Sequence, residues 1–201
     1  MLDETKKDKI LKASLEEFAA SGFDKASTDN ISKNAGVSKG LIFHYYGNKE
    51  NLYITTINMC VDDIFEEFNN VNYDEFDFID ALVGMMELKY KFFIKNPMHY
   101  KLLINSFYNP SKKIQKKLED RYAELKKIGV SIIVDMISKL PLKKDIEAID
   151  IITIIVSITN VVESKYLSYL TDDNDGFEKF YDSAKNEYIR LINIVLNGVI
   201  I

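Results

Sequence analysis

The sequence has 201 residues, of which 47% are hydrophobic and 28% are charged, so it can bury a core without disulfide bonds. Its formal net charge of −5 excludes a protein coated in positive potential, although a local basic patch is enough for nucleic-acid binding. The single cysteine, Cys60, excludes an internal disulfide and fits a reducing, cytoplasmic setting. The charged N-terminus has no apolar signal core. The most apolar run, residues 151–162, is shorter than the roughly 20 residues that span a bilayer, so no membrane partner is expected.

Apolar residues recur at helical spacing along almost the whole chain, and no convincing strand pattern is present. Gly22 is expected to end the first helix, Ser27 or Thr28 to cap the second, and Ser38 and Asn48 to cap the next two. The predicted helices run over residues 5–21, 28–35, 39–46, 49–70, 75–95, 98–107, 111–139, 143–170 and 176–198. The sequence therefore predicts an all-α fold of about nine helices.

The charge is segregated along the chain. Residues 30–49 hold three lysines, Lys33, Lys39 and Lys49, and neither Asp nor Glu. The formal net charge of the whole chain is −5 and that of residues 30–49 is +3, so the remaining residues carry a net charge of −8. This positive part of the chain coincides with the stretch "NAGVSKGLIFHYYGNKENL" at residues 34–52.

Two short helices joined by a glycine-containing turn are typical of the helix-turn-helix motif. Gly36 allows the turn without a Cβ clash, and Ser38 can satisfy an N–H at the start of the next helix. Some of the apolar side chains that follow must hold this helix to the others, which leaves Phe43 and His44 to face outward into a groove. Spacing alone leaves a second interpretation open, because glycine-containing helical hairpins are also common as purely structural elements.

Residues 28–53, "TDNISKNAGVSKGLIFHYYGNKENLY", resemble the DNA-binding signature of the tetracycline-repressor (TetR) family of bacterial regulators. The elements that match are Thr28, Ile31, Ala35-Gly36-Val37-Ser38, Lys39-Gly40, Phe43-His44-Tyr45-Tyr46 and Asn48-Lys49-Glu50-Asn51-Leu52. Upstream, residues 10–28 are similar to the family's first helix and its Gly-Phe turn. The motif match covers the first 55 residues or so, and the rest resembles the family only as a pattern of helices.

The resemblance implies a homodimeric transcriptional regulator rather than an enzyme. Residues 1–47 would form a three-helix helix-turn-helix domain, and residues 48–201 a larger helical domain for ligand binding and dimerisation. Double-stranded operator DNA and a small-molecule effector would be its partners, and the ligand would release the DNA. Thr28, Ser38, Tyr45 and Lys49 would contact phosphates, whereas Lys39, Gly40, Phe43 and His44 would lie in or beside the major groove.

Two departures from the family pattern bear on DNA recognition. The family often has tyrosine at the position of Phe43, so this chain loses a hydroxyl that could bond a phosphate; Tyr46 stands where phenylalanine is usual. No arginine precedes Arg121, so direct readout of guanine by a bidentate arginine is excluded from this helix. We expect Lys39, His44, apolar contacts and DNA shape to set the specificity, with a preference for A·T-rich operators.

The second half of the chain predicts an interface and a pocket. Residues 146–162 are apolar on nearly every side, which predicts a helix buried all round, either in a monomer or between its own core and a partner. The helices near 143–170 and 176–198 are the expected dimer interface. The predicted ligand-binding residues are Met86, Tyr90, Phe93, Leu103, Phe107, Tyr122 and Asn160, for a lipophilic ligand that is either neutral or cationic. Each Met or aromatic residue can equally belong to the core, and Asn160 can find its partner in a neighbouring side chain.

The chain lacks the motifs of several other functions. No nucleophile elbow, phosphate-binding loop, dinucleotide fingerprint or metal-ligand spacing is present, so neither a cofactor nor a metal is expected. Cys60 lies within a helix and is expected to pack as a small apolar residue. His99, next to Pro97, is interpreted as a surface residue at the start of a helix, with a pH-sensitive or ligand-contacting role as the alternative. The main alternative function is a helical small-molecule-binding or scaffolding dimer with a structural hairpin.

Overall fold

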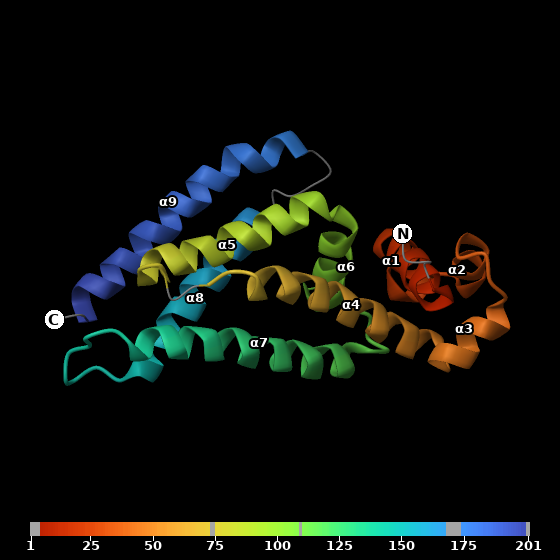
Figure 1. The fold of residues 1–201 in the computed structure, drawn as a ribbon, viewed down its shortest axis with the longest axis horizontal. Helices are drawn as coiled ribbons and strands as arrows, with labels where there is room; N and C mark the ends of the chain where they lie inside the picture. The colour runs from red at the N-terminus through yellow and green to blue at the C-terminus, as the bar shows by residue number, and fades with distance from the viewer. Residues whose placement is uncertain (1–4, 73–74, 109, 168–173, 200–201) are drawn as a thin grey trace. The chain divides into compact units, whose positions relative to one another are not determined.

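The computed structural model describes residues 5–72, 75–108, 110–167 and 174–199, which form nine helices and contain no strand (Figure 1). The all-α fold is therefore as predicted. The helices are α1 (Lys6–Lys25), α2 (Thr28–Asn34), α3 (Lys39–Tyr46), α4 (Lys49–Asn69), α5 (Phe78–Lys95), α6 (Pro97–Tyr108), α7 (Gln115–Ser138), α8 (Ala148–Leu167) and α9 (Asn174–Val199).

Helices α2, α3 and α4 start where the capping residues predict. The Ser27, Ser38 and Asn48 side chains each accept a backbone N–H in the first turn of the helix that follows. Gly22 has the predicted positive φ, 67°, but helical structure resumes after this kink and continues to Lys25. The predicted starts at residues 111 and 143 are too early by four and five residues, since α7 starts at Gln115 and α8 at Ala148. The predicted end of the eighth helix at 170 lies outside the described residues.

The chain divides into two compact units, and the first contains residues 1–71 and 89–123. Here α1 packs against α2, α4 and α6. The Phe18 ring meets the Tyr53 ring edge-on at 4.7 Å between centroids. The Tyr53 hydroxyl lies 2.8 Å from the Ser106 hydroxyl in a buried hydrogen bond. These contacts join α1, α4 and α6 into the core that supports the short helices α2 and α3.

The second unit contains residues 72–88 and 124–201, and its main contact is between α8 and α9. Ile151 and Ile155 on α8 and Ile192 on α9 are each at most 1% exposed. The hydroxyls of Thr159 and Tyr188 lie 3.0 Å apart across the same two helices. The compact units divide the chain by packing, whereas the predicted boundary at residues 47 and 48 divides it by function and stays a prediction.

The prediction that residues 146–162 are buried all round is wrong for the single chain. Ile149, Ile154 and Val161 are 57%, 41% and 60% exposed. One face of this helix is buried in the core of the chain, as the apolar sequence indicates. The sequence pattern alone could not show whether the opposite face is covered by the same chain or by a partner. The opposite face of α8 thus presents large apolar side chains to the surface.

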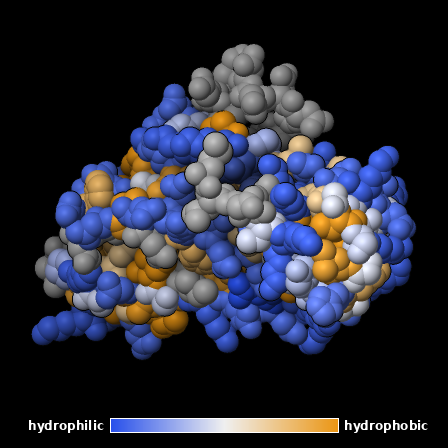
Figure 2. Space-filling view, turned by 45° about the vertical axis from the view of Figure 1, so that its right-hand side comes forward, coloured by the Kyte–Doolittle hydropathy of each residue, from blue (hydrophilic) through white to orange (hydrophobic). Residues whose placement is uncertain are grey.

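Polar side chains cover most of the surface seen in Figure 2, and apolar ones gather there in separate patches. Among the described residues, no helix is long and apolar enough to cross a membrane.

Candidate nucleic-acid interface

The turn between α2 and α3 is built by short-range contacts. The Ser27 hydroxyl accepts the N–H groups of Asp29 and Asn30 and so fixes the start of α2. Ala35 is 7% exposed, which lets the two helices approach closely. Gly36 has φ +66°, a conformation that glycine adopts without strain, and the Val37 N–H donates to the Ser32 carbonyl at 3.0 Å. The turn has the conformation that its sequence predicts.

Helix α3 has one buried side chain that packs on the core and three neighbouring side chains that are exposed at the surface. Ile42 is 1% exposed and fixes α3 against its neighbours. Phe43 and Tyr45 are 37% and 38% exposed, and His44 is exposed as well. The outward position of Phe43 and His44 is therefore as predicted, and Tyr45 joins them on the surface. This helix carries Lys39 and no acidic residue, so its charge does not oppose a negatively charged partner.

Lys39, at the tip of α3, has a partner on α2. Its Nζ lies 2.9 Å from the Asp29 Oδ2, and both side chains are largely exposed. An exposed ion pair of this type contributes about 0–1 kcal/mol, so a phosphate or a base edge can replace the aspartate at small cost.

Lys49 starts α4 at the edge of the same surface. Its Nζ donates to the Asp24 carbonyl at 3.3 Å and lies 5.2 Å from the centroid of the Phe23 ring. Partial burial lowers the pKa of Lys49, opposed mainly by the Asp24 carboxylate. Thr28 is the first residue of α2, and Gly40 lies in the first turn of α3. The structure thus gathers the predicted DNA-contacting residues on α2, α3 and the start of α4; their roles stay predictions.

Residues 111–121 bind to the helices that carry this surface, a feature that sequence reasoning missed. The Lys113 Nζ lies 3.2 Å from Asp24 Oδ1, and Lys117 pairs with Glu50. Arg121 Nε donates to Asn58 Oδ1 at 2.9 Å. Lys117 and Arg121 are four positions apart and share one face of α7, whereas Lys113 lies in the turn before this helix. The spacing of four positions is the signal that could have indicated a shared partner.

The predicted ligand-binding residues fall in both compact units. Met86, Tyr90, Phe93 and Leu103 are buried, at 2–7% exposed, and the rings of Phe107 and Tyr122 stack at 5.0 Å between centroids. Asn160 is exposed, so the argument that burial forces its amide to find a partner is wrong for the single chain. All seven assignments stay predictions.

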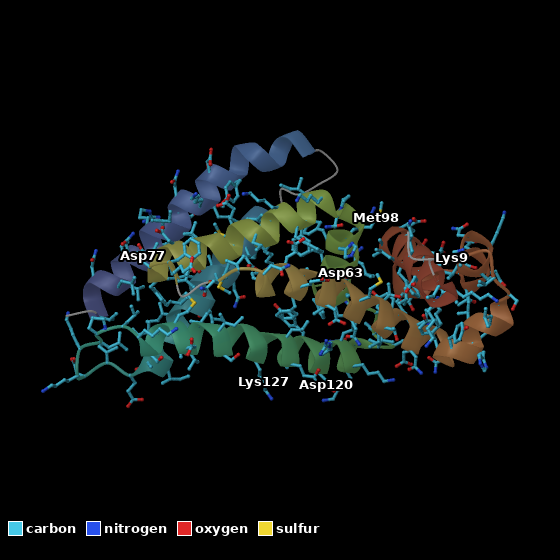
Figure 3. All side chains as sticks on the ribbon, in the orientation of Figure 1. Lys9, Asp63, Asp77, Met98, Asp120 and Lys127 are labelled. Carbon is cyan, nitrogen blue, oxygen red and sulfur yellow. The ribbon has the colours of Figure 1, made fainter. Side chains whose placement is uncertain are left out.

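The interpretation of His99 as a surface residue is wrong. Its side chain is only 13% exposed, and its Nε2 lies 2.9 Å from Asp63 Oδ2. Asp63 is labelled on α4 in Figure 3. The ring meets the Phe92 ring edge-on at 5.4 Å. The pair connects residues 36 positions apart, which local spacing cannot reveal.

The described residues offer little for catalysis or metal binding. Cys60 is buried as predicted, and desolvation raises the pKa of its thiol to about 12, so the nucleophilic thiolate is scarce at neutral pH. No group of three or more His, Cys, Asp or Glu side chains within the described part of the chain is arranged to hold a metal ion.

Residues 10–55 match a profile of the family described as bacterial regulatory proteins, tetR family. The biofilm operon HTH-type negative transcriptional regulator IcaR of Staphylococcus epidermidis is 31% identical over 86 residues, which are 43% of this chain and 44% of that protein. The HTH-type transcriptional repressor AcnR of Corynebacterium jeikeium is 39% identical over 49 residues, which are 24% of this chain and 26% of that protein. The matches thus span less than half the length of these relatives.

Solved structures are similar over nearly the whole chain. A transcriptional regulator from Rhodococcus sp. Rha1 superposes with a TM-score of 0.73 at 14% identity, over 97% of this chain and 98% of that one. A TetR-like transcriptional regulator from the same source has a TM-score of 0.67 at 16% identity, over 98% and 99% of the two chains. At these identities the likeness shows the fold alone, and the profile match concerns residues 10–55. This segment is similar to the DNA-binding region of the bacterial regulatory proteins of the tetR family, and the whole chain shares its fold with solved TetR-like regulators.

Proposed function

We propose that this protein is a DNA-binding transcriptional regulator, and specifically a repressor. It binds a palindromic operator as a dimer and leaves the operator when a small lipophilic ligand binds. The observation that carries the proposal is the outer surface of α3, where exposed Phe43, His44 and Tyr45 lie on a helix anchored through buried Ile42. A hairpin with a purely structural role would not require exposed aromatic side chains on a helix that contains neither Asp nor Glu.

In this proposal α3 enters the major groove. Lys39, Gly40, Phe43 and His44 lie in or beside the groove, and Thr28, Ser38, Tyr45 and Lys49 bind phosphates. Lys39 leaves its ion pair with Asp29 and binds DNA instead. The change costs little because both side chains of the pair are exposed. Without an arginine on α3, base recognition rests on Lys39, His44, apolar contacts with thymine methyl groups and DNA shape, which favours A·T-rich operators.

The direction of regulation is proposed from the relatives. One is named a negative regulator and another a repressor. Both matches cover less than half of either protein, so repression is a proposal for this chain.

Dimerisation through α8 and α9 is supported by the uncovered surface of α8. Ile149, Ile154 and Val161 are exposed there. The Thr153 and Ser157 hydroxyls on the same side donate to carbonyls of their own helix at 2.8 and 2.7 Å, so burying them leaves no donor unpaired. A two-fold dimer would set two α3 helices about 34–36 Å apart, one turn of DNA.

Ligand contacts within residues 48–201 are supported by the buried side chains of Met86, Tyr90 and Phe93. We propose Met86, Tyr90, Phe93, Leu103, Phe107, Tyr122 and Asn160 as contacts for a lipophilic effector. Methionine and aromatic side chains adapt to varied apolar shapes. Such a ligand releases DNA only if it binds more tightly to a conformation in which the two α3 helices of the dimer no longer fit one turn of DNA. The difference in its affinity for the two conformations limits the effect.

The test is a mobility-shift titration of the purified protein with the DNA that flanks its own gene, at two salt concentrations. We expect a shifted fragment that contains a palindrome and whose affinity falls at the higher salt. Absence of any bound DNA, both for this fragment and in a genome-wide selection of binding sites at low salt, would contradict the proposal and favour the structural hairpin.

A further inference from the structure

The first turn of α1 extends a cation over the recognition helix. The Lys7 Nζ lies 5.3 Å from the centroid of the Tyr45 ring, and Tyr45 is itself 38% exposed. A cation at this distance is attracted to the face of an aromatic ring. Lys7 is thereby held beside α3, although it is 38 positions away in the sequence.

The start of α1 is fixed by a capping box. The Asp8 carboxylate accepts the Thr5 N–H at 3.0 Å and the Thr5 hydroxyl at 2.7 Å, and the Thr5 hydroxyl in turn accepts the Asp8 N–H. These hydrogen bonds lower the pKa of Asp8. The Asp8 carboxylate is therefore engaged in ordering the helix start, and it is not paired with Lys7.

The direction of Lys7 follows from the helical period. Lys7 shares one face of α1 with Leu11, Ser14 and Phe18, of which Ser14 and Phe18 are fully buried. This face packs into the core of the first compact unit. Lys7 lies on the same face at the N-terminal end of α1, where its side chain reaches the Tyr45 ring. Lys9, on the same turn of α1 (Figure 3), and Lys12 are exposed elsewhere on the helix.

We propose that Lys7 binds a DNA phosphate beside the one contacted by Tyr45, and so extends the DNA interface from α2, α3 and α4 to the first turn of α1. This inference rests on the proposed function. It is argued from the contact between Lys7 and Tyr45 and from charge, because residues 5–12 hold four lysines and one aspartate. Asp3 and Glu4 precede this segment, outside the described residues.

The experiment measures operator affinity of the full chain against salt concentration, for the wild type and for Lys7→Ala. The loss of one phosphate contact should reduce the slope of log K against log[salt] by about 0.9 and weaken binding roughly three- to tenfold at low salt. Lys7→Arg keeps the charge and should keep the slope. Lys12→Ala is the matched control, since it removes the same charge from a position about 140° around the helix from Lys7.

A second comparison separates direct contact from positioning of Tyr45. If Lys7 itself binds phosphate, Lys7→Ala should still reduce the slope in a Tyr45→Leu background. Loss of the Lys7 effect in that background would show that Lys7 only orients Tyr45 and would overturn the inference. So would an equal slope change in Lys12→Ala, which would indicate a diffuse charge effect.

Lys39→Ala distinguishes this inference from the proposed function. If Lys39→Ala weakens binding and Lys7→Ala matches the wild type, the Lys7 contact is wrong while the regulator proposal stands. If the wild type itself binds no DNA, both are overturned.

Discussion

At the scale of single residues, the candidate interface depends on two glycines with different tasks. Gly36 has a positive φ and shapes the turn, whereas Gly40 lies inside α3, where any residue fits. A Cβ built on Gly40 would meet nothing closer than the Ser38 hydroxyl at 4.0 Å. Of these two positions, the structure of the protein requires glycine only at Gly36, and the proposed close approach of DNA accounts for Gly40.

Substituting each glycine by alanine separates stability from DNA binding. Gly36→Ala should lower the free energy of unfolding by about 1 kcal/mol, because alanine is strained at this φ. Gly40→Ala should raise it by up to about 1 kcal/mol through helix propensity, yet weaken operator binding, because the new methyl group stands between backbone and DNA. Chemical denaturation and a binding titration on both variants check this. A Gly40→Ala protein with undiminished affinity would remove Gly40 from the interface.

At the scale of helices, local chemistry explains what the sequence could predict. Ser27, Ser38 and Asn48 cap α2, α3 and α4 as expected, because a capping hydrogen bond involves neighbours within three residues. Contacts between distant positions could not be predicted. The bond between His99 and Asp63 joins α6 to α4, and the Lys113 and Lys117 pairs join residues 113–117 to α1 and α4. The uncovered side of α8 was missed because apolar composition does not tell a core face from an interface.

Ser38 serves the helix as a cap and, in our proposal, the DNA as a phosphate ligand. The Leu41 N–H donates to its hydroxyl at 3.2 Å. Ser38→Ala should cost about 1 kcal/mol of stability, and Ser38→Asp almost none, since aspartate caps as well as serine. Both should bind operator DNA more weakly, and Ser38→Asp more so, because its carboxylate repels phosphate. Thermal unfolding and DNA titration of the two variants provide the check, and wild-type affinity in Ser38→Asp would mean that no phosphate lies near this cap.

At the scale of the whole molecule, our proposal makes DNA binding depend on assembly through the exposed side of α8. The fold is shared with solved regulators at 14–16% identity over nearly the whole chain, which shows how little this fold constrains the sequence. Apolar surface that a single chain leaves uncovered, with its hydroxyls satisfied internally, is what a self-complementary interface requires.

Val161→Asp should therefore shift the protein from dimer to monomer, because a buried, unpaired carboxylate is costly at an interface. Light scattering after size-exclusion chromatography measures the mass. Met98→Asp is the matched control, since Met98 is an exposed apolar residue, 44% accessible, on α6. We expect the control to keep the wild-type mass. A Val161→Asp protein that remains dimeric would mean that the interface lies elsewhere.

The most direct test of the central claim, that α3 contacts operator DNA, is the affinity of Lys39→Ala for the operator selected by the wild type, measured by fluorescence anisotropy. The account predicts binding weaker by about tenfold or more, which is about 1.4 kcal/mol, with an unchanged unfolding curve, because the Lys39–Asp29 pair is exposed. Lys101→Ala, an exposed lysine on α6, should bind as the wild type does. Equal affinities of Lys39→Ala and the wild type would show that α3 is not the recognition helix.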